Sequence, residues 1–62
     1  MITGNHTSIV EGKKVNVFYE KRPFSIHITI RRVTNESGED VFGKMTSRQL
    51  QTIREEIKDL FT

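Results

Sequence analysis

The 62-residue sequence contains no cysteine, no tryptophan and a single proline. Without cysteine no disulfide can form, and such a composition is compatible with a reducing compartment. No apolar run approaches the roughly 18 residues that a membrane span needs, and no secretory apolar segment stands near the N-terminus. We therefore expect a cytoplasmic protein.

The chain is also poor in residues for catalysis and metal binding. A nucleophile needs an adjacent base, and the chain offers only His6 and His27 beside hydroxyl and carboxylate groups. Ser25 and Thr29 share the expected strand face of His27, but neighbours two residues apart lie about 6.5 Å from each other, beyond hydrogen-bond reach. There is no spaced acidic cluster and no glycine-rich phosphate loop. The sequence predicts a protein that is not an enzyme and binds no metal or cofactor.

The length bounds the architecture. Sixty-two residues, of which 34% are hydrophobic, make one domain over residues 1–62 with a thin core. A small core without disulfides or metals gains stability from self-association. We expect a homodimer.

The clearest pattern is the alternation in residues 24–33, FSIHITIRRV. Large apolar residues recur at every second position, which is typical of a strand with one buried and one solvent-facing side. The expected buried residues are Phe24, Ile26, Ile28 and Ile30. The expected outward residues are Ser25, His27, Thr29 and Arg31.

The remaining strands are predicted less sharply. Residues 1–5 are expected to be a frayed terminus, residues 6–10 a short edge strand, and residues 11–13 a tight turn at Gly12. Residues 14–20 alternate as a strand with high β-branched and aromatic content. Residues 40–45 are expected to return as a last strand.

A helix follows at the C-terminus. Thr46 and Gln49 have the spacing of a capping box. After them an apolar stripe with helical periodicity is formed by Leu50, Ile53, Ile57, Leu60 and Phe61. The sequence thus predicts an α+β fold in which a three- to four-stranded antiparallel sheet is covered on one face by a single C-terminal α-helix.

Charge is distributed unevenly along the chain. Residues 1–34 hold six basic and two acidic residues, a net charge of +4, whereas residues 35–62 hold four basic and six acidic residues, a net charge of −2. The positive charge of the strand-forming half favours binding of a polyanionic partner on the sheet side. The alternative is that these charges only keep a small protein soluble.

Aromatic and basic side chains predict a nucleic-acid site on the open sheet face. Aromatic rings stack on unpaired bases, and lysine or arginine neutralises phosphates. The predicted site residues are Asn16, Phe18, His27, Thr29, Arg31, Phe42 and Lys44, with Lys21, Arg22 and Arg32 as a positive rim. The alternative is that Phe18 and Phe42 pack on each other, or in a dimer interface, without a ligand.

The segment Gly43-Lys44-Met45-Thr46-Ser47, which leads into QLQTIREEI at residues 49–57, resembles the transcriptional-coactivator family of single-stranded-DNA-binding proteins. Ile30-Arg31 is similar to a step in the preceding strand of that family. The resemblance covers residues 14–60 and implies dimerisation through the helix, with unpaired DNA held on the sheet. It assigns that role to Phe18, Arg31 and Lys44. The chain departs from the family in lacking tryptophan and in its modest basic excess.

Two other functions are compatible with the sequence. One is a small adaptor or inhibitor, like the host-directed proteins of bacterial viruses, that binds a larger protein through its sheet face or an edge strand. The other is a reader of duplex DNA that inserts its sheet into the major groove. We expect single-stranded nucleic acid as the partner before duplex.

Overall fold

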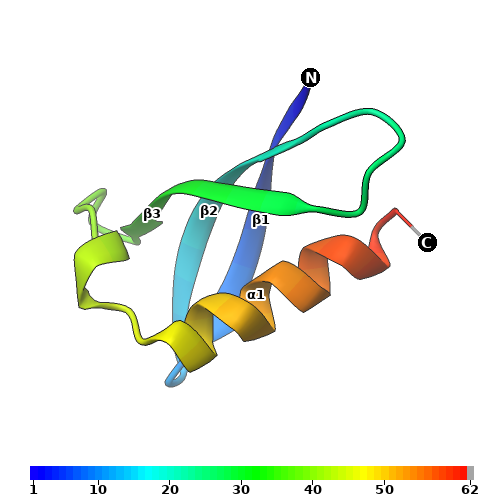
Figure 1. Cartoon of the computed structure of the whole chain (residues 1–62). Coiled ribbons are helices and arrows are strands. Elements are labelled where there is room, and N and C mark those ends of the chain that lie inside the picture. Colours follow the sequence, from blue (N-terminus) through cyan, green and yellow to red (C-terminus); the bar gives the residue numbers. More distant parts are fainter. Residues whose placement is uncertain (62) are drawn as a thin grey trace.

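A three-stranded antiparallel sheet and one C-terminal helix make up the protein (Figure 1). The structure is a computed structural model and describes residues 1–61. The sheet has the order β1-β2-β3, and α1 lies across one face, so the predicted α+β class is confirmed. The elements are β1 (Ile2–Val10), β2 (Lys13–Lys21), β3 (Ile28–Asn35), the 3₁₀ turn η1 (Phe42–Lys44) and α1 (Ser47–Asp59). Among residues 1–61 no helix is long and apolar enough to cross a membrane.

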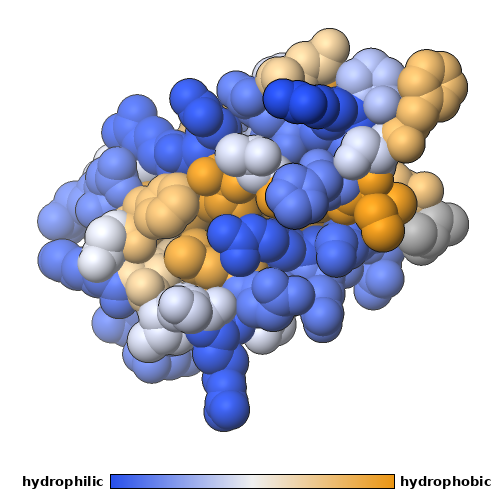
Figure 2. All heavy atoms as spheres, viewed as in Figure 1, coloured by the Kyte–Doolittle hydropathy of each residue, from blue (hydrophilic) through white to orange (hydrophobic). Residues whose placement is uncertain are grey.

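The core lies between α1 and the sheet. Side chains alternate along β2, so every second residue faces the helix. Figure 2 shows apolar side chains reaching the surface as a broken band with polar side chains on both sides. The buried apolar residues are Val15, Val17, Tyr19, Ile28, Ile30, Val33, Ile53 and Ile57.

The first hairpin follows the predicted turn and extends further than expected. Glu11 and Gly12 have φ values of 51° and 78°, as a two-residue hairpin turn requires. β1 pairs with β2 over its whole length, from Val10 opposite Lys13 to Ile2 opposite Lys21. The prediction that residues 1–5 are frayed was wrong, because the length of β2 gives these residues a pairing partner.

β3 begins at Ile28, four residues later than predicted. The turn at Pro23-Phe24, in which Ser25 N donates to Arg22 O over 3.3 Å, ends the pairing with β2. Ile28 lies opposite Lys21, the last residue of β2, so residues 24–27 have no strand beside them. Phe24 and Ile26 are exposed, and their predicted burial was wrong. Alternation in the sequence continues here past the end of the partner strand.

A β-bulge changes which residues of β3 face outward. Ile30 lies opposite Tyr19 but Arg32 lies opposite Phe18, so β3 carries Arg31 as one extra residue. The extra residue resets the alternation, and Val33 is fully buried where an unbroken strand would expose it. Arg31 and Arg32 are consequently both exposed.

The predicted last strand at residues 40–45 does not form. Asp40 makes a single bridge to Thr34, and Asp40 Oδ1 then accepts from Phe42 N over 2.9 Å. This local hydrogen bond turns the chain into η1, so a side chain competes successfully with sheet pairing. Phe42 is half-buried and packs against the core.

α1 begins as its sequence predicts. Thr46 caps the helix through Gln49 N, and Gln49 Oε1 accepts from Thr46 N over 3.0 Å, which completes the capping box. Ile53 and Ile57 are buried, but Leu60 and Phe61 at the end of the stripe stay exposed. The Phe61 ring meets the Tyr19 ring edge-on, with 6.2 Å between centroids.

Candidate nucleic-acid interface

The sheet face opposite α1 carries mainly polar side chains, and we call it the open face. The strand register determines which residues belong to the open face, because residues directly opposite each other on neighbouring strands point to the same side of the sheet. Phe18 on β2 lies between Asn5 on β1 and Arg32 on β3. The open face is formed by Thr3, Asn5, Thr7, Ile9, Lys14, Asn16, Phe18, Glu20, Thr29, Arg31, Arg32 and Thr34.

Phe18 is the aromatic residue of this face, with 37% of its surface exposed. A ring that lies in the middle of three strands, with an amide on one side and a guanidinium on the other, has a surface on which a flat ligand can stack. Tyr19 points the opposite way and is buried in the core.

Arginines flank Phe18 without strong partners. Arg31 Nε is 3.5 Å from Glu20 Oε1, and Arg32 Nε is 4.0 Å from Asp40 Oδ2. The Arg31 and Arg32 side chains are 63% and 57% exposed. Ion pairs this exposed contribute little to stability, so both guanidinium groups can turn to an incoming anion at low cost.

Two hollows share lining residues on this side of the sheet, and one of them lies beside Phe18. The first, about 270 Å³, is lined by Thr3, Gly4, Asn5, Phe18, Tyr19, Glu20 and Arg31. The second, about 290 Å³, lies where β2 ends and β3 begins and is lined by Met1, Glu20, Lys21, Arg22, His27, Thr29 and Arg31. Because Glu20 and Arg31 line both, the hollows form one path from the aromatic ring to the end of the sheet.

The structure brings together eight of the ten residues predicted for the site and its rim. Five of them, Asn16, Phe18, Thr29, Arg31 and Arg32, lie on the open face. Lys21, Arg22 and His27 surround the hollow at the end of the sheet. His27 was predicted on the strand itself but lies in the connection before β3, where its N–H donates to Ser25 Oγ over 3.1 Å.

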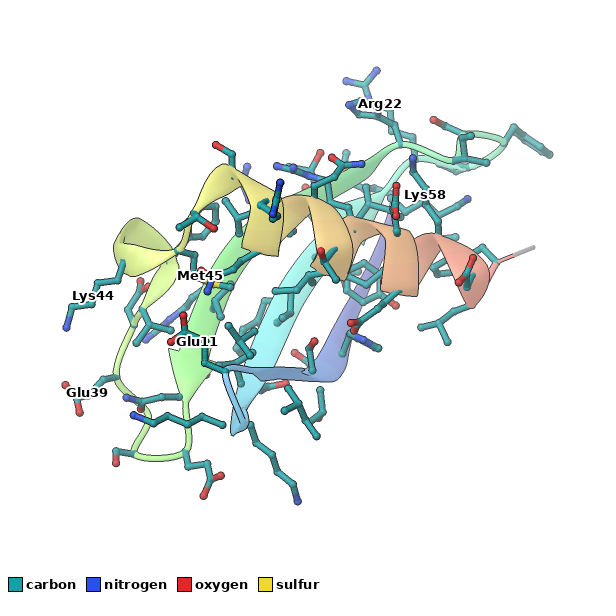
Figure 3. All side chains as sticks on the ribbon, turned by 90° about the horizontal axis from the view of Figure 1, so that it is seen from below. Glu11, Arg22, Glu39, Lys44, Met45 and Lys58 are labelled. Carbon is teal, nitrogen blue, oxygen red and sulfur yellow. The ribbon has the colours of Figure 1, made fainter. Side chains whose placement is uncertain are left out.

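The placement of Phe42 and Lys44 on this face was wrong. Both belong to η1 and not to a strand, and Phe42 packs on the core. Figure 3 shows Lys44 far from Arg22. Any ligand on the open face therefore meets one aromatic ring and not the predicted pair.

Sequence reasoning missed several members of the open face. Asn5 was assigned to a frayed terminus, and Lys14 was not considered as a site residue. Arg32 was expected only at the rim, but the bulge places it directly beside Phe18. Consecutive arginines just before a buried valine were the available signal, since a regular strand would turn one of them inward.

A second polar cluster ties β1 to α1. His6 Nε2 lies 2.9 Å from Glu56 Oε1, and the buried Ser8 hydroxyl donates to the same oxygen over 2.9 Å. Ser8 bonds to Glu56 and not to His6, so the cluster does not contain the hydrogen-bonded pair of nucleophile and histidine base found in many active sites. Among residues 1–61 no three His, Cys, Asp or Glu side chains are grouped to hold a metal ion.

Comparison with known proteins finds no matching family model, no matching curated protein and no matching solved structure. The resemblance of residues 14–60 to the coactivator family stays a prediction.

Proposed function

We propose that the protein binds single-stranded nucleic acid, most readily DNA, on the open face, without a catalytic step. The observation that supports this most is Phe18, half-exposed in the middle of the sheet with Arg32 directly opposite it and Arg31 beside it. A regulatory role in transcription or DNA metabolism in the cytoplasm is the setting that we propose for this binding.

The chemistry of the face favours an unpaired strand. A stacking ring needs the flat side of a base, which a duplex hides inside its stack. Lys14, Arg31 and Arg32 can each neutralise a phosphate, and the threonine and asparagine side chains around them can hydrogen-bond to sugars and base edges. The proposed occupant is a short segment of one strand.

Titration of labelled single-stranded and duplex oligonucleotides by fluorescence anisotropy tests the proposal. With three phosphates neutralised, log K for the single strand should fall with log salt at a slope of about −2. The duplex should bind more weakly at every salt concentration. Absence of single-strand binding at low salt would overturn the proposal.

Two phenylalanine variants locate the site. Phe18→Ala should weaken single-strand binding by about 1–3 kcal/mol, because it removes the stacking surface. Phe24→Ala is the matched control, since Phe24 is exposed but lies in the connection between β2 and β3, outside the open face. Equal effects of the two changes would remove Phe18 from the site.

A second candidate function, docking on a larger protein, is favoured by Phe24. Its side chain is fully exposed and its φ is 62°, a left-handed conformation that is unfavourable for a bulky residue and usually taken by glycine in such a turn. Strain of this kind is found at functional sites. An adaptor would use Phe24 as an apolar anchor in a pocket of its partner.

Photo-crosslinking tests this alternative. A photoreactive phenylalanine analogue at position 24, introduced in the cell of origin, should give one discrete product with a larger protein if the adaptor function holds. The same analogue at position 18 is the control. No product, or the same products from both positions, would exclude Phe24 as an anchor.

A further inference from the structure

The hollow at the end of the sheet has its own chemistry, distinct from stacking on Phe18. We call it the end groove and define it by Glu20, Lys21, Arg22, His27, Thr29 and Arg31. It lies at the last pair of β2 and β3, Lys21 opposite Ile28, and is bounded by the connection between these strands.

The end groove holds more positive charge than one internal phosphate of a strand needs. Lys21, Arg22 and Arg31 line it together with a single carboxylate, Glu20, so these four side chains carry a net charge of +2. An internal phosphodiester carries one negative charge, whereas a phosphate monoester carries about −1.5 to −2 at neutral pH. The charge of the end groove therefore matches a monoester.

Local hydrogen bonds shape the wall of the end groove. Ser25 N donates to Arg22 O over 3.3 Å, and His27 N donates to Ser25 Oγ over 3.1 Å. These two bonds tie the backbone of Arg22 to that of His27 across the turn. The Arg22 guanidinium and the His27 imidazole therefore belong to the same folded connection between β2 and β3.

The position of the end groove determines which part of a strand reaches it. It shares Glu20 and Arg31 with the hollow beside Phe18, so a strand stacked on Phe18 enters it after leaving the sheet. Its volume of about 290 Å³ suits a terminal nucleotide more than a long segment.

We propose that the end groove binds the terminal phosphate monoester of a single-stranded nucleic acid bound on the open face. This inference rests on the proposed function and adds recognition of a chain end to it. Arg22 and Arg31 are the donors suited to bidentate contact with the phosphate oxygens. Lys21 Nζ lies 5.0 Å from the centroid of the Phe61 ring and donates to Arg22 O over 3.3 Å, so Lys21 contributes positive charge beside the groove and not a direct contact. The 5′ and 3′ monoesters share this chemistry.

Affinities for four oligothymidines of one length test the inference: both ends hydroxyl, a 5′ phosphate only, a 3′ phosphate only, and both. Each carries the label inside the strand, and salt is constant. One singly phosphorylated arm should bind about tenfold tighter than the hydroxyl form. The other should show little gain, because a strand bound in one direction brings only one of its ends to the end groove. A non-specific effect of the added charge would instead be equal for the two ends. Equal gains at both ends, or none at either, would overturn the inference.

Two charge variants assign the effect. Arg22→Gln should abolish the gain from the phosphate, taken as the ratio of the two affinities in the same variant, so that any loss of affinity for the hydroxyl form cancels. Lys44→Gln, the same loss of one positive charge far from Arg22, should keep the gain. Retention of the gain in Arg22→Gln would also overturn the inference.

Failure of the inference is distinguishable from failure of the proposed function. If hydroxyl-ended strands bind and Phe18→Ala weakens them, but phosphorylation has no effect, only the end groove assignment falls. If no oligonucleotide binds in any arm, both proposals fall.

Discussion

At the scale of the residue, Ile26 and Ile28 have the same side chain and lie two positions apart, yet only Ile28 is part of the core. Ile28 is 3% exposed, whereas Ile26 is 65% exposed in the connection before β3. Burial of the same side chain is worth about 2–3 kcal/mol at one position and little at the other. The start of β3, and with it the extent of the open face, depends on this difference.

Alanine substitution should destabilise the protein strongly at Ile28 and hardly at all at Ile26. Ile28→Ala should lower the free energy of unfolding by about 2–5 kcal/mol, because it removes buried methyl groups and leaves a cavity. Ile26→Ala should change it by less than about 0.5 kcal/mol, as expected for a surface substitution. Urea denaturation of both variants measures the difference. A large loss in both would mean that the strand begins earlier, as the alternation in the sequence predicts.

At the scale of the element, α1 depends on its cap and its packing more than on its surface. Arg54 and Lys58 are like charges four residues apart, and such pairs destabilise a helix. The capping box at Thr46 and burial of Ile53 and Ile57 compensate for this.

Thr46→Ala should therefore lower the free energy of unfolding by about 1 kcal/mol, because Gln49 N loses its acceptor. Thr46→Ser is the control and should change the free energy of unfolding by only a few tenths of a kcal/mol, because serine keeps the hydroxyl acceptor and ranks slightly above threonine as a cap. Thermal unfolding followed by circular dichroism compares them. Identical melting of all three proteins would show that the cap does not limit α1.

Local rules were sufficient for some elements and not for others. The cap of α1, the turn at Gly12 and the alternation of β2 follow from neighbouring residues, and the sequence predicts all three. The bulge at Arg31 and the end of pairing at Lys21 depend on which residues lie opposite, so no local pattern contains them. Phe42 was misplaced for a related reason, because the Asp40 side chain supplies a bond that replaces strand pairing.

At the scale of the whole molecule, β1 is an edge strand of unusual composition. Its nine residues include no lysine, arginine, aspartate, glutamate or proline, the residues that commonly protect sheet edges. The homodimer expected from the small core has an available route here, in which β1 pairs with β1 of a second copy.

Light scattering coupled to size exclusion tests this route. The wild type should elute with twice the mass of one chain, and Thr7→Lys, which places a charge on β1, should shift it toward the monomer. A monomeric wild type at all concentrations would contradict the predicted homodimer.

Amide chemical shifts measured during titration with oligothymidine decide whether nucleic acid binds on the open face. We expect the largest changes at Asn5, Phe18, Arg31 and Arg32, with α1 and η1 nearly unaffected. Changes confined to α1 and η1, with the amides of the sheet unmoved, would contradict binding on the open face.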